Sequence, residues 1–260
     1  MSVQTAHLRT FHTPVRAILV KRKPANGGRC SRRAAGFCKS LGRPLKSDEV
    51  PLARAILFGD TCSREFVIRK AAGDDRVILG NAAPIKDGDG TVVAGIVVFT
   101  DITERKRLED VQTFLAQTSS GGAKEPFFGA LARYLAQSLG MDCVCIDRLE
   151  GDGLNAYPVA VWCDGRFEDN VTYALKDTPC GDVVGKQVCC FPSSVCQLFP
   201  RDPVLKGLRA ESYVGVTLFG HTGKPVGLIA VIGRGPLSNR PLTEAVLKLV
   251  AVRAASEIER

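Results

Sequence analysis

The sequence lacks the short motifs that mark common enzyme classes. It has no Gly-x-Ser-x-Gly nucleophile motif, no Walker phosphate loop and no His-Glu-x-x-His zinc motif. Its ten cysteines include no Cys-x-x-Cys pair and no Cys/His spacing typical of structural zinc. Its apolar runs fall well short of the roughly 20 residues that a membrane-spanning helix needs. These absences favour a protein that is not an enzyme, and they leave no candidate catalytic residue or metal ligand. They also disfavour a membrane-spanning helix.

Acidic residues are also missing from residues 1–46, which contain 11 Lys or Arg. The rest of the chain carries 24 basic and 27 acidic side chains, so the formal net charge of +8 belongs to the N-terminal segment. Such a composition fits a transit peptide, or an arm that contacts nucleic acid or anionic lipid. We favour a third interpretation, a misread or truncated start, and treat residues 1–47 as a basic arm without an assigned role. Because the remainder is nearly neutral, a nucleic-acid-binding function is disfavoured.

The cysteines are expected to be reduced thiols. The chain is larger than the small secreted domains that depend on disulfides, and it shows no secretory signal. Cys143 and Cys145 alternate along an apolar run and are expected to pack as small hydrophobic side chains. The alternative, a redox or metal role, applies to the later cysteines, which are Cys180, Cys189, Cys190 and Cys196.

Residues 75–110 are the most informative segment. Two apolar runs rich in β-branched residues, 77–85 and 92–99, flank an Asp-Gly-Asp-Gly turn and predict a β-hairpin. Asp101 then has the side chain of a helix N-cap, and Glu104 stands three residues later, as in a capping box. The pattern predicts a helix over residues 104–123.

The run GNAAPIKDGDGTVVAGIVVFTDITERKR resembles the last two strands of a PAS domain, including the Asp-Ile-Thr motif that ends such domains. The resemblance implies a partial PAS domain over residues 48–103. It also implies that Asp101 and Thr103 cap the outgoing helix and couple the sheet to it. Together with Glu104 they form the predicted signal-coupling motif.

The second half of the chain reads as helix, strands, irregular crossover, strands and helix. Its apolar patterns predict a helix over 126–139 that stops at Gly140 and a final helix from about 241, with Ser238 or Asn239 as cap. The expected strands cover 141–149, 154–162, 171–175, 213–219 and 225–232, with a crossover of small helices and turns over 176–210. This order is typical of an α+β domain with an antiparallel sheet.

The segments TPCGDVVGKQVCCFP and LFPRDPVLKGLRAESYVGVTLFGHTGKPVGLIAVIGR resemble a bacterial GAF domain. In that family the crossover and the sheet enclose a small-molecule pocket, so the resemblance implies a small ligand. Residues 167–170 do not reproduce the signature of cyclic-nucleotide-binding relatives, and the Cys-His pair of bilin-binding relatives is missing. The Asn-Cys-Arg-Phe core of flavin-binding PAS domains is missing as well. Ligand and cofactor therefore stay unassigned.

The sequence thus predicts an α+β protein in which two domains with antiparallel sheets are joined by a linker helix over 104–123, with the GAF domain over 124–260. The expected function is a cytoplasmic sensory module that relays ligand binding to an output domain or partner kinase outside this chain. Homodimers would form through residues 102–115 and 242–260. The resemblances imply the input region of a sensor histidine kinase or of a cyclic-di-nucleotide signalling enzyme. Three alternatives stay open: a histidine-kinase fragment with residual or partner-supplied activity in a phosphorelay, a nucleic-acid-binding protein, and a vestigial fragment.

Overall fold

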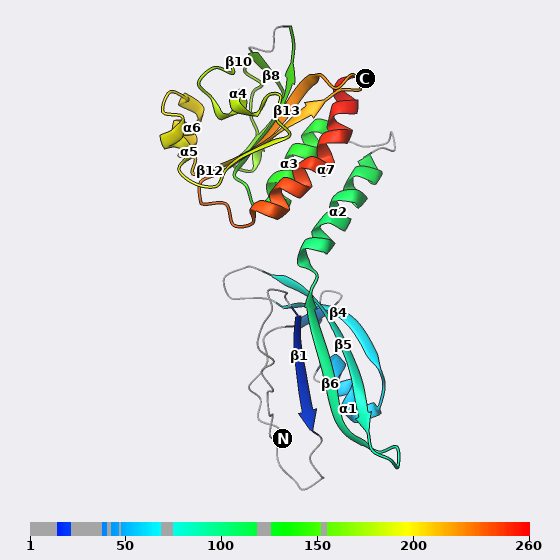
Figure 1. Ribbon diagram of the computed structural model, residues 1–260. Coiled ribbons are helices and arrows are strands. Elements are labelled where there is room, and N and C mark those ends of the chain that lie inside the picture. The colour runs from blue at the N-terminus through cyan, green and yellow to red at the C-terminus, as the bar shows by residue number, and fades with distance from the viewer. Residues whose placement is uncertain are drawn as a thin grey trace. The chain divides into compact units, whose positions relative to one another are not determined.

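The computed structural model describes residues 15–21, 38–40, 43–46, 48–68, 75–118, 126–151 and 155–260. The chain divides into two compact units, Met1–Lys106 and Arg107–Arg260. Each unit is α+β with one antiparallel sheet, which confirms the predicted fold class (Figure 1). The division falls inside helix α2 (Thr103–Thr118), so the first turn of this helix belongs to unit 1 and the rest to unit 2. Within the described ranges, no helix has both the length and the apolarity to cross a membrane.

In its described residues, unit 1 is a six-stranded sheet with one helix on it. The strand order is β1-β6-β5-β4-β2-β3. The bounds are β1 (Val15–Lys21), β2 (Cys38–Ser40), β3 (Arg43–Pro44), β4 (Cys62–Ile68), β5 (Arg76–Lys86) and β6 (Val92–Asp101). Helix α1 (Pro51–Phe58) lies close against β6, because a Cβ at Gly95 would come within 2.7 Å of Ile56 Cγ1. A side chain at position 95 would therefore lift the helix off the sheet.

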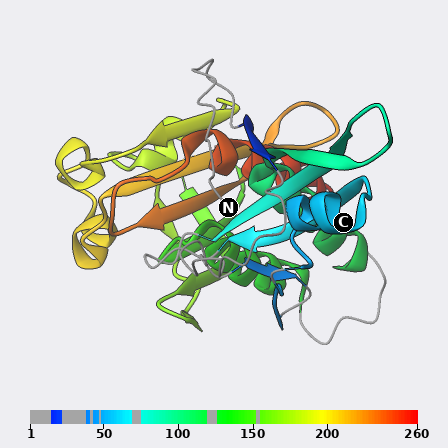
Figure 2. The ribbon, with the colours of Figure 1, turned by 90° about the horizontal axis from the view of Figure 1, so that it is seen from below.

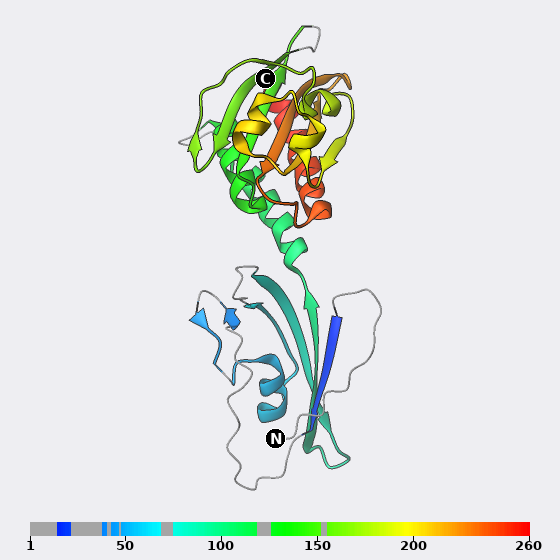
Figure 3. The same ribbon diagram turned by 90° about the vertical axis from the view of Figure 1, so that its left-hand side faces the viewer.

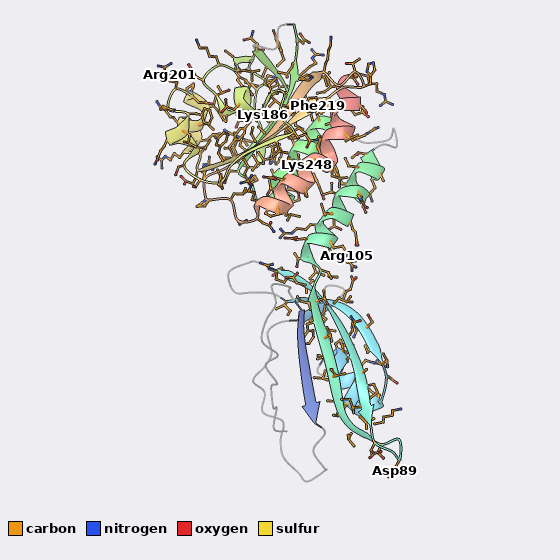
Figure 4. The ribbon with its side chains drawn as sticks, in the orientation of Figure 1. Asp89, Arg105, Lys186, Arg201, Phe219 and Lys248 are labelled. Atoms are coloured by element: carbon orange, nitrogen blue, oxygen red, sulfur yellow. The ribbon has the colours of Figure 1, made fainter. Side chains whose placement is uncertain are left out.

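The predicted hairpin is present as β5 and β6. Its turn is held by the Asp87 carboxylate, whose Oδ1 accepts the backbone N–H groups of Asp89 at 3.1 Å and Thr91 at 2.8 Å. Gly90 supplies the positive φ angle of 80° that the turn requires. Asp89 lies at the tip of the hairpin (Figure 4).

Part of the segment that we expected to be an unassigned arm belongs to the sheet of unit 1. Residues 15–21 pair antiparallel with β6, from Val15 opposite Thr100 to Lys21 opposite Ala94. The short strands β2 and β3 continue the opposite edge beyond β4. These strands thus belong to the sheet of unit 1, while most of the rest of residues 1–47 lies outside the described residues.

Unit 2 is built on a seven-stranded sheet with the order β10-β8-β7-β13-β12-β11, and β9 pairs with β8. The bounds are β7 (Cys143–Leu149), β8 (Asn155–Cys163), β9 (Arg166–Phe167), β10 (Tyr173–Ala174), β11 (Val188–Phe191), β12 (Ser212–Phe219) and β13 (Pro225–Gly233). The sequence predicts all of these except β9 and β11. Its expected third strand shortens to the two residues of β10.

One face of this sheet is covered by helices α3 (Phe127–Leu139) and α7 (Arg240–Ile258), together with the later turns of α2 (Figure 1). Both predicted helix ends are confirmed. Gly140 closes α3 with a left-handed φ of 65°, and the Asn239 side chain accepts the N–H of Leu242 at the start of α7. The ring of Phe114 on α2 stacks on Tyr134 of α3 with centroids 4.2 Å apart.

The other face is covered by the crossover, which contains the short helices α4 (Pro179–Val183), α5 (Val195–Leu198) and α6 (Pro203–Leu208). These helices lie on the side of the sheet away from α3 and α7 (Figure 3), and α5 and α6 gather at one end of unit 2 (Figure 2). Thr178 and Asp202 cap α4 and α6 with their side chains. The crossover is therefore ordered and packed, as the sequence predicts.

Candidate functional site

Unit 2 contains a pocket of about 330 Å³ between the sheet and the crossover. Its floor is formed by β7, β8, β12 and β13, and its walls by α4, α6 and the segment 164–171. The lining is mainly apolar. This volume lies at the lower end of the usual range for ligand pockets, roughly 300–1,000 Å³, so the pocket suits a small molecule.

A larger depression of about 730 Å³ lies beside α4 and α5. It is open to solvent and is bordered by exposed groups such as Leu198 and the Asp177–Arg201 ion pair. The buried thiol and phenol groups of unit 2 face the smaller pocket. We therefore take the smaller pocket as the candidate site.

Four thiols line this pocket: Cys143 and Cys145 on β7, Cys163 on β8 and Cys180 on α4. Cys143 and Cys145 are two residues apart on one strand, so they share a face. Cys163 is the direct cross-strand neighbour of Cys143. Hydrogen bonds from Cys145, and then from Cys163, hold the pKa of the Cys143 thiol below its ordinary value although burial opposes this. The pKa values of Cys145 and Cys163 are raised.

A buried polar chain lies next to the thiols. Tyr173 donates a hydrogen bond to Asp147 Oδ2 at 3.0 Å, and Cys180 Sγ lies 3.3 Å from the Tyr173 hydroxyl and 3.2 Å from that of Tyr213. A tyrosine hydroxyl carries a single proton. The contacts are satisfied together if Tyr213 donates to Cys180, the Cys180 thiol donates to the Tyr173 oxygen, and Tyr173 donates to Asp147.

Asp147 is the buried end of this chain, with no solvent exposure. It continues the Cys143–Cys145 face of β7, and no donor in the described part of the chain reaches its Oδ1. Burial raises its pKa to about 7, and the hydrogen bond from Tyr173 opposes this only in part. The carboxyl group therefore changes charge near neutral pH, behind an apolar pocket.

Arg234 fixes the rim of the pocket where β13 ends. Its guanidinium pairs with both carboxylate oxygens of Asp164 at 2.6 and 2.8 Å, and its Nε donates to the Leu208 carbonyl at 2.9 Å. The Arg234 backbone N–H donates to Asp142. One side chain thus ties the ends of β8, β13 and α6 together beside Cys143.

The predicted signal-coupling motif lies in unit 1, where β6 becomes α2. Asp101 Oδ1 accepts the backbone N–H of Thr103 at 2.9 Å and its hydroxyl at 2.5 Å. The Thr103 hydroxyl oxygen in turn accepts the N–H of Val77 on β5 at 2.9 Å. Burial opposes the charged form of Asp101, but the hydrogen bonds from Thr103 and the Arg76 cation keep its pKa below the ordinary value. The structure thus joins β5, β6 and α2 through two side chains.

Glu104 lies in the first turn of α2, where a carboxylate is favoured by the helix dipole. Two residues later, Lys106 pairs with Glu65 of β4 at 2.9 Å. The start of the helix is therefore connected to a third strand of the sheet.

The sequence of residues 125–258 matches the GAF domain family. This chain belongs to the GAF domain family. The matched residues contain the whole pocket, together with α3 and α7. GAF domains are ligand-binding sensory modules, which agrees with the small pocket. The PAS interpretation of residues 48–103 stays a prediction.

Several solved structures are similar to the chain. The chromophore-binding domain of a Stigmatella aurantiaca bacteriophytochrome, crystallised as a Thr-to-His mutant, is 15% identical over 84% of each chain, with a TM-score of 0.47. The GAF domain of an Acinetobacter phosphoenolpyruvate-protein phosphotransferase is 14% identical, covering 59% of this chain and 93% of that one, with a TM-score of 0.48. A type II free methionine-R-sulfoxide reductase from Thermoplasma acidophilum is 20% identical, covering 51% and 89%, with a TM-score of 0.42. A search of curated proteins found no match. At these TM-scores the likenesses support no inference about a ligand.

The structure does not bring the four predicted redox cysteines of the GAF domain together. Cys180 lines the pocket, whereas Cys196 on α5 contacts the Leu205 carbonyl at 3.1 Å. Cys189 and Cys190 are neighbours on β11 and face opposite sides of the sheet, the latter toward the helices. Across the described ranges, no group of three or more His, Cys, Asp or Glu side chains is arranged to hold a metal ion.

Sequence reasoning missed Cys143, Cys145 and Cys163 as site residues. The signal was present in the alternation of the first two along an apolar strand. We interpreted that alternation as core packing. Both thiols do pack in the core, but on the face that the pocket hollows out. Only the pairing of β7 with β8 brings in Cys163.

Proposed function

We propose that this protein is a cytoplasmic signalling sensor whose GAF domain binds a small, largely apolar molecule in the pocket between the sheet and the crossover. The observation that supports it best is the pocket, where an apolar lining adjoins a buried, titratable Asp147 and a row of thiols. A strand with a purely structural role gains nothing from a carboxyl group at such a position.

Binding would be relayed through helices. Occupancy of the pocket favours one arrangement of the crossover and the sheet, and α7 packs directly on β12 and β13 on the opposite face. Helix α2 shares the same core through Val111, while its first turn holds the Thr103–Val77 hydrogen bond. A partner outside this chain, such as a kinase of a two-component phosphorelay, receives the change, with homodimers formed through α2 and α7. A ligand achieves this only if its affinity differs between the two arrangements.

The test begins with native mass spectrometry of the full chain for a co-purifying small molecule, followed by a thermal-shift screen of small apolar compounds. Ala230 is fully buried and lines the pocket, so Ala230→Val fills part of it. Ala174→Val makes the same exchange at an exposed position on β10 and serves as the matched control. We expect Ala230→Val to weaken binding of every hit and Ala174→Val to leave it unchanged.

Relay is read by hydrogen exchange in α2 and α7 with and without the hit. Equal binding by wild type and Ala230→Val would show that this pocket is not where the ligand binds. Failure to find any bound or stabilising compound, or ligand binding with no exchange change in either helix, would contradict the sensor function itself.

A further inference from the structure

Two of the thiols that line the pocket are arranged in a way that non-covalent ligand binding does not require. Cys143 and Cys163 are 3% and 6% exposed, yet both line the pocket, so a small molecule inside it reaches them directly. They lie on adjacent strands at matched positions of the β7–β8 ladder.

The pairing type brings these two side chains close. The Asp164 N–H donates to the Asp142 carbonyl at 3.1 Å, a bond that flanks the Cys143–Cys163 pair from outside. This identifies the pair as a non-hydrogen-bonded one, in which opposed Cα atoms are about 4.5 Å apart. A disulfide accepts Cα separations of about 4.4–6.8 Å, so this pair is within range.

Cys145 is a poorer partner for Cys143. Residues two apart on a strand are separated by about 6.6 Å along the chain, at the upper limit for a disulfide. Cys180 is held by hydrogen bonds to the hydroxyl groups of Tyr173 and Tyr213. Cys163 is therefore the thiol best placed to bond to Cys143.

We propose that Cys143 and Cys163 form a peroxide-reactive dithiol, in which a small hydroperoxide entering the pocket oxidises the pair to a cross-strand disulfide. The Cys143 thiolate attacks the outer peroxide oxygen, the O–O bond breaks, and the alkoxide leaves with a proton from solvent as an alcohol, or as water when the oxidant is hydrogen peroxide. Cys143 is then a sulfenic acid. The Cys163 sulfur attacks it, and its proton leaves with the hydroxide as water. The sum is two thiols and one hydroperoxide converted to one disulfide, one alcohol and one water.

The division of roles follows from the surroundings of each thiol. Hydrogen bonds from Cys145 and Cys163 lower the pKa of the Cys143 thiol although burial and the Asp164 carboxylate oppose this, and the Arg234 cation lowers it further. Burial raises the pKa of Cys163, so this thiol stays protonated until the sulfenic acid forms. The thiolate is the nucleophile in such reactions. Cys143 therefore attacks and Cys163 resolves.

The proposal shares the pocket of the proposed function but needs no non-covalent ligand. The test treats the reduced full chain with stoichiometric hydrogen peroxide or cumene hydroperoxide, blocks the remaining thiols and maps tryptic peptides without reductant. Trypsin places Cys143 and Cys145 in peptide 134–148 and Cys163 in peptide 149–166, so the disulfide appears as a cross-link between the two peptides. Fragmentation between residues 143 and 145 identifies the bonded sulfur in the wild type, without any variant.

Variants then assign the roles. We expect Cys143→Ser to abolish the cross-link, and Cys163→Ser to abolish it while a dimedone-reactive sulfenic acid accumulates at Cys143. Cys190→Ser, on the helix side of the sheet, is the control and keeps the cross-link. Circular dichroism confirms that each variant is folded.

The rate of cross-linking should rise with pH, with a midpoint below that of an unperturbed cysteine thiol. A cross-link that persists in Cys143→Ser, that maps to Cys145, or that does not form while other thiols are oxidised overturns the proposal. If ligand binding under reducing conditions remains sensitive to Ala230→Val, the proposed function survives that result. If the cross-link forms but ligand binding is lost, the dithiol proposal stands and the proposed function fails.

Discussion

Asp147→Asn should change the pH dependence of stability of unit 2. The pKa of Asp147 is about 7 in the folded protein, against an ordinary value of 3.8. The folded state therefore holds a proton that the unfolded state releases between these two values. The contribution of Asp147 to stability is then most favourable below pH 3.8 and is lost as the pH rises toward 7.

The magnitude follows from the two pKa values. Each unit of difference corresponds to about 1.4 kcal/mol, so the full effect above pH 7 is about 4 kcal/mol. Part of this is already lost at pH 5, which leaves roughly 2.5 kcal/mol between pH 5 and pH 8. Asparagine has the same shape and no charge, so Asp147→Asn removes this dependence. The amide nitrogen would take the place of Oδ1, which has no hydrogen-bond partner. Burying an unpaired amide group there costs about 1–3 kcal/mol at every pH.

The assay is urea denaturation at pH 5, 6, 7 and 8, followed by the fluorescence of Trp162. This residue is the single tryptophan of the chain and lies on β8 against Phe167, so its signal reports on unit 2. Stability of Asp147→Asn relative to wild type should rise by roughly 2.5 kcal/mol from pH 5 to pH 8. Asp169→Asn, the same exchange at an exposed pocket position, is the control and should follow the wild type. Parallel curves for wild type and Asp147→Asn would refute the reasoning.

Two further substitutions test the coupling motif and the crossover. Thr103→Ala removes the acceptor of the Val77 N–H, so hydrogen exchange at Val77 should accelerate about 5–30-fold, equivalent to 1–2 kcal/mol, while Thr103→Ser should retain protection. Unchanged exchange in the alanine variant would mean that the hydrogen bond does not stabilise the strand. Gly215→Ala puts a methyl group 2.6 Å from Val183 Cγ2 and should destabilise unit 2 by about 1–3 kcal/mol in urea, whereas Gly207→Ala, which meets nothing within 4 Å, should not. Equal stability of the two variants would show that helix α4 shifts to accommodate the added methyl group at little cost.

Local chemistry allowed much of unit 2 to be predicted. Gly140 ends α3 because a glycine tolerates the left-handed backbone there, and Asn239 starts α7 because its side chain accepts a free helix N–H. Both features are set by residues within a few positions of the helix ends. The β5–β6 hairpin was predictable for the same reason, since its turn residues adjoin its strands.

Features that depend on distant pairing were not predictable. β1 lies about 80 positions from the β6 residues that it pairs with, and nothing local to residues 15–21 identifies that partner. β11 was missed because it is four residues long and its Cys189–Cys190 pair suggested thiol chemistry instead of a strand. The register of β7 against β8 includes an irregularity between Ile146 and Asp147. That register decides that Cys143 faces Cys163, and no pattern in a single sequence encodes it.

The two faces of β7 show why the pocket is best explained by function. Val144 and Ile146 face the helices and are fully buried among apolar side chains, as a strand selected for stability requires. The alternate positions carry Cys143 and Asp147, which are buried, and Cys145, which is half-buried. An apolar residue in place of Asp147 would remove a cost of about 4 kcal/mol at pH 8, a large part of the 5–15 kcal/mol by which a domain is usually stable. Stability alone gives no reason to bury a carboxyl group there, so its presence beside a pocket and a reactive thiol pair is best explained by the chemistry of what the pocket receives.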